Sequence, residues 1–283
     1  CTMSRKSLAG RIVRSPRGAI CALFLLALVL CAIFAPWIAP YDYAAQKLSM
    51  ANTPPSVAHW LGTDEFGRDL LSRIIQGART SLSVSVLSIA LSVLMGATLG
   101  AAAGYFGGVF DKVVTVFVDL TWSFPEILLA LILIAILGPG LHSTAIAIAI
   151  AYLAQFTRLT RAQVMALKGE LFVDAAVTAG ARPARVLFLH LLPNAMTPVI
   201  VAGMLATGDA IVLEATLGFF GLGAQPPVPS WGAMMSSGTA QIFIAPWIII
   251  FPGLVIATAV IAINVFGDAL IEALDIRRPL RDG

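Results

Sequence analysis

The chain contains a run of twenty residues without a charged side chain, from Ala19 to Ile38. As a helix this run rises about 30 Å, the thickness of a bilayer's hydrocarbon core. Because basic residues precede it and Pro36-Trp37 closes it with an interfacial aromatic, we predict a retained membrane helix rather than a cleaved signal. The composition agrees, since 59% of residues are hydrophobic and 12% charged, against about 45–50% and 25% in soluble domains. We therefore expect a polytopic membrane protein.

Five further apolar stretches predict an all-α chain with six transmembrane helices. They cover residues 81–104, 112–137, 144–165, 195–217 and 247–270, so that residues 81–270 form a five-helix core. Phe124-Pro125 interrupts the third stretch, because proline cannot continue the helical hydrogen bonds. Asp119 and Glu126 lie seven residues apart in that stretch, which on a continuous helix places them on one face.

Small residues recur every three or four positions along the 81–104 stretch. Such a stripe allows another helix to approach closely. Packing within this chain and packing against a second subunit remain equal alternatives. The stripe consists of Ser81, Ser85, Ser88, Ser92, Gly96, Gly100 and Gly104.

The distribution of Lys and Arg predicts the orientation. With a cytoplasmic N-terminus (residues 1–18), six spans place the tail (271–283) inside as well, and fourteen basic residues then lie inside against four outside. This agrees with the positive-inside tendency. Residues 39–80 become extracytoplasmic, and residues 166–194 become the largest cytoplasmic loop. The net charge of +3 is too small to indicate a nucleic-acid partner.

The extracytoplasmic segment carries several polar residues of interest. We expect Thr63 or Asp64 to cap a short helix there, and Asp69 and Arg73 to form an i,i+4 pair. His59 has no second ligand at useful spacing, so it is expected to be a surface or loop-packing residue rather than a metal ligand.

The cytoplasmic loop contains a short small-residue helix from Asp174 to Gly180. Ala175, Ala176 and Ala179 are expected to gather on one low surface that the groove of another protein accepts. Gly180 supplies the positive φ that ends the helix, and Arg182-Pro183 starts a new direction.

Four carboxylates lie within or beside the predicted spans: Asp119, Glu126, Asp209 and Glu214. Carboxylates in a membrane usually face an interior or a cavity, because lipid exposure is costly. They are candidate residues of a translocation path for a cationic or zwitterionic substrate. Structural hydrogen bonding is the alternative for each.

Several chemistries have no support in the sequence. There is no phosphate loop of the G-x-x-x-x-G-K-[ST] type, no H-E-x-x-H and no C-x-x-C. The three histidines fall on different segments, and Cys21 and Cys31 are too far apart on one helix for a disulfide. We expect a chain that is not an enzyme, binds neither metal nor cofactor, and cannot hydrolyse ATP alone.

Several motifs resemble the dipeptide, oligopeptide and nickel branch of bacterial ABC importer permeases, on its DppC/OppC side. Asp174-Ala175-Ala176, Gly180 and the later Leu192-Pro193 resemble the EAA loop of that family, with Asp in place of Glu. The further motifs are residues 59–64, 68–70, 104–108, 124–125, 190–194 and 225–232.

The resemblance implies a type I importer permease fold (MetI-like) in the bacterial inner membrane. It also implies a coupling helix docked on an ATPase, formed by residues 174–180 of the cytoplasmic loop. We name residues 166–194 the coupling segment. Its implied ATPase-coupling residues are Asp174, Ala175, Ala176, Ala179, Gly180, Arg182, Leu192 and Pro193. The implied partners are a DppB/OppB-like second permease, an extracytoplasmic binding protein, and two ATPase subunits that hold ATP and Mg²⁺. The chain would form half of a path for di- and oligopeptides.

Three alternatives to peptide import remain at this stage. Nickel chelates are the rival cargo, although no predicted span offers clustered histidines or thiolates. An ion-coupled secondary transporter would use the acidic residues as coupling sites but has no need for a docking helix. A membrane scaffold would need neither the carboxylates nor the broken third span.

Overall fold

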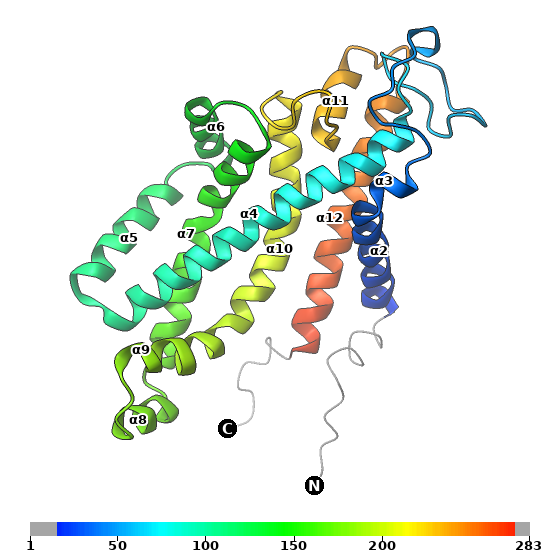
Figure 1. Ribbon diagram of the computed structural model, residues 1–283. Helices are drawn as coiled ribbons and strands as arrows, with labels where there is room; N and C mark the ends of the chain where they lie inside the picture. Colours follow the sequence, from blue (N-terminus) through cyan, green and yellow to red (C-terminus); the bar gives the residue numbers. More distant parts are fainter. Residues whose placement is uncertain (1–15, 275–283) are drawn as a thin grey trace. The chain divides into compact units, whose positions relative to one another are not determined.

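The computed structural model describes residues 16–274 of the chain, and these are almost entirely helical (Figure 1). Within that range, strand pairing is limited to one isolated bridge between Thr63 and Asp69. The all-α expectation is confirmed. Most of the predicted basic N-terminus and the tail with Arg277, Arg278 and Arg281 lie outside the described residues.

The helices are given in chain order, together with a 3₁₀ turn (η1) and a π-helical turn (η2). They are α2 (Pro16–Ile33), α3 (Ala35–Ile38), η1 (Leu48–Met50), α4 (Leu70–Phe106), α5 (Gly108–Trp122), α6 (Glu126–Leu137), α7 (Leu141–Leu167), α8 (Leu171–Thr178), α9 (Pro183–Arg185), η2 (Val186–Leu191), α10 (Leu192–Phe219), α11 (Trp231–Thr239) and α12 (Trp247–Ala273).

The chain divides into two compact units. The first combines residues up to 86 with residues 137–144 and 207 onward, and the second comprises residues 87–136 and 145–206. Helix α4 begins in the first unit and ends in the second, whereas α10 does the reverse.

The first unit is built around α12. Helices α2 and α11 both pack against it, and Figure 1 shows the blue α2 beside the red α12. Trp231 of α11 is fully buried in this core. Its indole N–H donates to the carbonyl of Ile74 at 3.1 Å, and its backbone N–H donates to the Ser81 hydroxyl at 3.2 Å. These bonds fix α11 to the first part of α4.

The membrane-length apolar segments agree with the predicted spans with one exception. Helices α2, α4 and α12 and the segment Pro183–Phe219 are each long and apolar enough to cross a bilayer, and the bent pair α5–α6 makes a fifth. Helix α7 corresponds to the remaining predicted span but is more polar. It tolerates this because polar side chains such as Thr157 and Thr160 are buried by protein instead of facing lipid.

The third predicted span is not one continuous helix. It bends by 96° between α5 and α6, at the break that contains Pro125. Proline lacks an amide proton and its ring clashes with the preceding turn, which ends the helix. The prediction that Asp119 and Glu126 share a helical face is therefore wrong, because the break separates them.

The second span begins earlier than expected, at Leu70 rather than Ser81. Asp69 caps it, accepting hydrogen bonds from the Ser72 backbone N–H at 2.8 Å and from the Ser72 hydroxyl at 2.7 Å. The cap predicted at Thr63 or Asp64 is wrong, and so is the pairing of Asp69 with Arg73. His59 is buried and its Nδ1 lies 2.8 Å from Asp69, so of the two expected roles, surface and loop-packing residue, it has the second.

The glycine part of the small-residue stripe packs within this chain. In the second unit, Gly96, Gly100 and Gly104 of α4 face the backbone of α7, and a Cβ added at Gly100 would lie 2.2 Å from the Thr157 carbonyl oxygen. Only residues without a side chain permit that approach. Of the two alternatives that the sequence left open, packing within this chain therefore holds for these three glycines.

Candidate coupling segment and translocation residues

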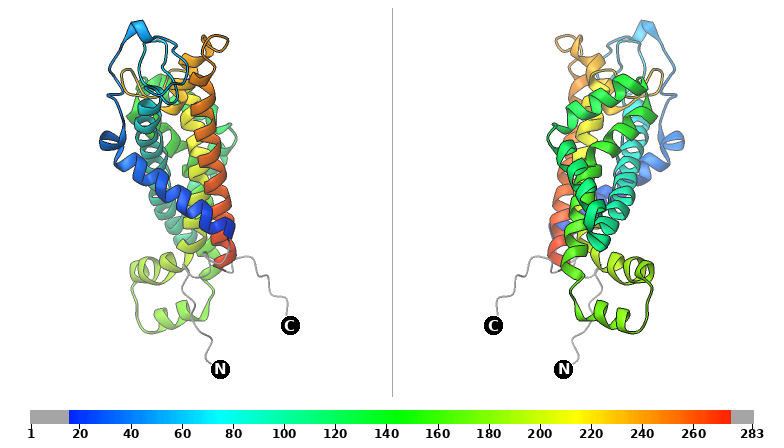
Figure 2. Two further views of the ribbon diagram at one scale, coloured as in Figure 1. Left: turned by 90° about the vertical axis from the view of Figure 1, so that its right-hand side faces the viewer. Right: turned by 90° about the vertical axis from the view of Figure 1, so that its left-hand side faces the viewer.

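The coupling segment is a helical hairpin of the second unit rather than a loop. Helix α8 (Leu171–Thr178) is joined by the turn at Gly180 to a helix that begins at Pro183 and continues into α10. Figure 2 shows this hairpin in yellow-green. The sequence placed the start of the fifth span at Ala195, but the helix begins at Pro183.

Gly180 ends α8 as predicted, with φ at +81°. The Ala181 N–H donates to the Ala176 carbonyl at 3.0 Å, and the Gly180 N–H donates to the Val177 carbonyl at 2.9 Å. This pair of bonds is the Schellman arrangement, which satisfies the last carbonyls of a helix and favours glycine at the left-handed position. A Cβ added at Gly180 would meet no atom within 4 Å, so the requirement for glycine comes from the backbone alone.

Arg182 and Pro183 set the direction of the second arm. Arg182 is extended, with φ −64° and ψ 148°, as expected for a residue before proline. Further along, the backbone widens into the π-helical turn Val186–Leu191, where the Leu192 N–H donates to the Leu187 carbonyl. Pro193 follows directly and has no N–H to donate, so the wider turn accommodates its ring. Leu192 and Pro193 therefore lie inside a helix.

The alanines at positions 175 and 176 of α8 and Ala179, the residue that follows its last turn, do not share one surface. Ala176 is half-buried and packs with Val173 against a cluster formed by Ala101, Val164, Val186, Leu187, Leu191 and Ala195. Ala175 and Ala179 are exposed, as are Asp174 and Arg182. The predicted low surface is thus divided, and the exposed side of α8 is formed by the other two alanines with larger apolar neighbours.

Large apolar side chains accompany these alanines on the exposed side of α8. Leu171 is 85% and Val177 55% exposed, and Phe172 is 40% exposed. Exposed apolar side chains gathered on one short helix are typical of an interaction surface.

Two polar contacts anchor the start of the coupling segment to neighbouring helices of its unit. The Lys168 ammonium donates to the Tyr105 carbonyl at 2.6 Å in the last turn of α4. Earlier in α7, Arg161 forms a two-pronged pair with Asp111 of α5, and its Nη2 lies 2.7 Å from Oδ2. These contacts hold the end of α7 from which the hairpin extends.

The four candidate path carboxylates occupy different environments. Asp119, Glu126 and Asp209 are exposed, whereas Glu214 is completely buried. The hydroxyl groups of Ser81 and Ser230 face the Glu214 carboxyl group. However, neither Glu214 oxygen meets the geometry of a hydrogen bond within the described part of the chain.

Sequence reasoning missed a cluster of charged residues before α4. Asp64 Oδ2 lies 2.6 Å from Arg68 Nε and 3.3 Å from Arg73 Nε, and all three side chains are almost fully buried. The spacing of Asp64 and Arg68 gave a partial signal, because charges four residues apart often pair. The sequence gave no signal for Arg73, because it is nine positions from Asp64 and no regular spacing predicts that pair.

Comparison with known proteins decides the family. The profile of the binding-protein-dependent transport system inner membrane component matches residues 96–278, and that of the N-terminal TM domain of oligopeptide transport permease C matches residues 7–55. The chain belongs to this transport permease family. It is a membrane permease subunit of an ABC importer and not an enzyme, which excludes the ion-coupled carrier and the scaffold.

Relatives resemble the chain over most of its length. It is 46% identical over 259 residues to the di/tripeptide transport system permease protein DppC of Pseudomonas aeruginosa, with 89% of this chain and 86% of the relative covered. The dipeptide permease DppC of Alkalihalophilus pseudofirmus is 44% identical (89% and 83% covered). The glutathione transport system permease GsiD of Shigella flexneri is 42% identical (94% and 88% covered).

A solved structure confirms the predicted fold of this permease. The chain aligns with a subunit of the inward-facing MetNI methionine ABC transporter with a TM-score of 0.59 and 17% identity, covering 72% of this chain and 97% of that one. The MetI-like expectation is therefore confirmed. As in other members of the family, ATP is hydrolysed on separate subunits, so the permease works with an ATPase, another permease and a binding protein.

Proposed function

We propose that this permease forms half of the path through which an ABC importer carries short peptides into a bacterial cell. The observation that carries the proposal is the similarity, over 89% of the chain, to a permease named for di- and tripeptides. The relative named for glutathione, a tripeptide, favours the same class of cargo. Three exposed carboxylates, Asp119, Glu126 and Asp209, are proposed to line the path and to meet the amino group of the peptide.

The specific partners follow from the same proposal. A second, homologous permease completes the path, two ATPase subunits supply ATP and Mg²⁺, and an extracytoplasmic binding protein selects the peptide. Helix α8 is proposed to dock on one ATPase. Its exposed Leu171, Phe172 and Val177 provide the apolar surface, because such side chains gain most when a partner removes them from water.

The proposed orientation has both termini in the cytoplasm and the coupling segment on the same side. In the first unit, Trp247 at the start of α12 donates its indole N–H to the Thr63 carbonyl at 3.1 Å. The 39–69 segment therefore covers the end of the unit at which α12 begins, and the chain leaves α12 at the other end. This supports the arrangement indicated by the basic residues.

Uptake by the complete transporter tests the cargo. The permease pair, its ATPases and the binding protein are reconstituted in proteoliposomes, and ATP-dependent uptake of a dipeptide, a tripeptide, glutathione and a nickel chelate is compared. We expect uptake of the peptides. Nickel uptake without peptide uptake would overturn the peptide assignment and leave the permease family unaffected.

Labelling in intact cells tests the orientation. Single cysteines at Val57 (96% exposed), Phe243 (99% exposed) and Ala184 (exposed), in a background without native cysteines, are treated with an impermeant maleimide. Val57→Cys and Phe243→Cys are expected to react from outside and Ala184→Cys only after lysis. External labelling of Ala184→Cys would show that the coupling segment faces outside and would refute the proposed orientation.

A further inference from the structure

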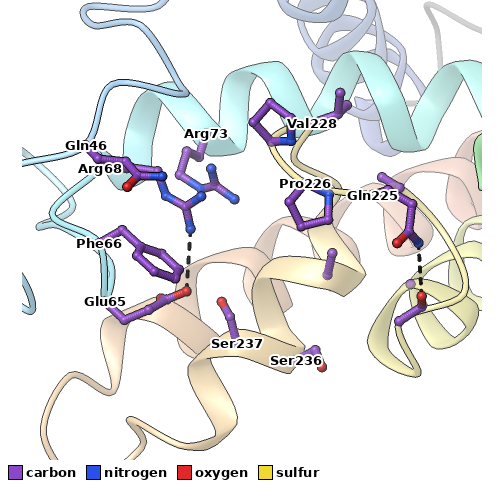
Figure 3. A pocket seen from close by; sticks show the side chains of 15 residues that line it. Gln46, Glu65, Phe66, Arg68, Arg73, Gln225, Pro226, Val228, Ser236 and Ser237 are labelled. Carbon is purple, nitrogen blue, oxygen red and sulfur yellow. Dashed lines mark hydrogen bonds and ion pairs between the residues drawn. The ribbon is translucent and has the colours of Figure 1, made fainter.

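The first unit contains a cavity of about 420 Å³, lined by both polar and apolar residues, that the proposed mechanism of coupling does not use. One wall comes from the segment before and at the start of α4, and the opposite wall comes from the end of α10, the following loop and α11. Figure 3 shows Arg68, Arg73 and Glu65 on the first wall, with Gln225 and Ser237 on the second. A cavity of this size lies in the usual range for small-ligand sites.

The two arginines present unused donors to this cavity. Arg68 Nε and Arg73 Nε both contact Asp64, and Arg73 Nη1 donates to the Tyr43 carbonyl at 3.2 Å. Arg68 Nη2 lies 3.4 Å from Glu65 Oε1. Within residues 16–274, Arg68 Nη1 and Arg73 Nη2 form no hydrogen bond or ion pair, and Figure 3 shows both guanidinium groups pointing into the cavity.

Glu65 presents the complementary group. Its Oε1 lies 3.4 Å from Arg68, but its Oε2 is buried and accepts no hydrogen bond from any residue that the structure describes. A buried carboxylate oxygen without a donor is costly. The side chain as a whole is 18% exposed and lines the pocket. An ammonium group of a ligand would therefore bind Oε1, or Oε2 after the carboxyl group rotates, and such a charge-assisted bond would be comparatively strong.

The carboxylate of Asp64 lies against both arginines and neutralises part of their positive charge. It accepts the Phe66 and Arg68 backbone N–H groups at 2.9 Å each, in addition to its arginine contacts, so it has little capacity left for a ligand. The cavity thus offers fixed guanidinium donors and the carboxyl group of Glu65. This pattern matches a ligand that carries a carboxylate and an ammonium group.

We propose that this cavity is a low-affinity receiving site for a short peptide, with its carboxylate on Arg73 and Arg68 and its amino group on Glu65. The proposal rests on the proposed function and deepens it, since it places the two charged ends of the cargo on named residues. A free dipeptide is small enough for the cavity and carries both groups. A zwitterionic lipid headgroup shares part of this chemistry and is distinguished in the test.

The test measures ligand binding to the purified complete transporter in nanodiscs without the binding protein. Saturation-transfer NMR compares Ala-Phe with N-acetyl-Ala-Phe, which lacks the ammonium, and with Ala-Phe amide, which lacks the carboxylate. Ligands are varied here in place of Arg73, because an Arg73 variant would also break the contact with Asp64 that holds this wall. We expect both blocked ligands to bind about tenfold more weakly than Ala-Phe.

The protein variant is Glu65→Gln, and its matched control is Glu272→Gln, which removes an exposed carboxylate near the last residue of α12. Glu65→Gln should weaken Ala-Phe binding about tenfold and leave N-acetyl-Ala-Phe unchanged, whereas Glu272→Gln should change neither. Equal binding of all three ligands to the unmodified transporter, or an unaltered affinity in Glu65→Gln, would refute the site.

Two further outcomes separate the competing explanations. Nanodiscs of phosphatidylglycerol alone and with phosphatidylethanolamine are compared, and loss of Ala-Phe binding in the second would assign the cavity to a lipid headgroup and overturn the proposal. Peptide uptake with the binding protein is measured on the same preparation. If uptake is intact but the ligands bind with equal affinity, only the receiving site is refuted. If the unmodified transporter takes up no peptide, the proposed function is refuted.

Discussion

Gly100 of α4 and Thr157 of α7 lie backbone against backbone, so that a Cβ on Gly100 would be 2.2 Å from the Thr157 carbonyl oxygen and 2.9 Å from the Arg161 nitrogen. Both obstacles are backbone atoms and cannot move aside as a flexible side chain would. The glycine is therefore required by the approach of two helices.

Gly100→Ala should destabilise the second unit, because the added methyl group forces α4 and α7 apart. Overpacking of this kind typically costs about 1–3 kcal/mol, and the melting temperature of the purified complex should fall. Gly169→Ala is the control, since a Cβ there meets no atom within 4 Å and its φ is not in the left-handed region. An unchanged melting temperature in Gly100→Ala would contradict the packing.

The ion pair between Arg161 of α7 and Asp111 of α5 provides a second test of the packing within the second unit. Their side chains are 28% and 19% exposed, so solvent screens the pair in part, and we expect a coupling free energy of about 1 kcal/mol. Arg161→Lys should lose much of it, because lysine lacks the planar fork.

A double-mutant cycle with Arg161→Gln and Asp111→Asn measures that coupling from the thermal or denaturant stability of the four proteins. If the two substitutions are strictly additive, the pair does not stabilise the contact between α5 and α7.

Features set by local sequence were predicted well. The apolar runs located the helices, Gly180 located the end of α8, and Pro125 located the break in the third span, because each depends on residues within a few positions. The predicted first residues of the helices that contain α4 and α10 were wrong. Both helices begin before their apolar runs, and Asp69, which caps α4, also pairs with His59, ten positions earlier in the sequence.

Side-chain partners across long sequence separations were not predictable. The pairing of Arg73 with Asp64 depends on how the segment before α4 folds back, and the cavity beside it needs the loop after α10. The alanines of α8 show the same limit. Spacing placed them near one another, but only the position of the Val186–Ala195 arm decides that Ala176 is the inward residue.

Substitutions at Gly180 should separate backbone strain from steric conflict. Because φ is +81° and the surrounding space is open, Gly180→Asn should be tolerated better than Gly180→Ala, and Gly180→Val least, with a cost of about 1–3 kcal/mol for the strained cases. Substrate-stimulated ATP hydrolysis and peptide uptake should decline in that order.

The control for this series is the amount of permease in the membrane and of ATPase that co-purifies with it. Normal assembly with normal stimulated hydrolysis in Gly180→Val would remove the reason to assign α8 a coupling role.

Glu214 is the carboxylate whose burial argues against a place on an open path. It is completely buried, and the hydroxyl groups that face it already accept backbone N–H groups: Ser81 from Trp231 at 3.2 Å and Ser230 from Ala233 at 3.4 Å. Their protons remain available to face the carboxyl group. We interpret Glu214 as part of the contact between α10, α4 and α11 within the first unit.

Glu214→Met tests that interpretation, because it removes the carboxyl group and leaves the buried hydroxyl protons of Ser81 and Ser230 without an acceptor, which typically costs about 1–3 kcal/mol. We expect a lower melting temperature and retained peptide uptake in the protein that folds. Asp209→Asn, at an exposed position one and a half turns earlier on the same helix, is the comparison and should lower uptake without changing stability. If Glu214→Met folds normally but no longer transports, the carboxyl group must reach the path in another conformation of the transporter, and Glu214 would rejoin the other three carboxylates as a path residue.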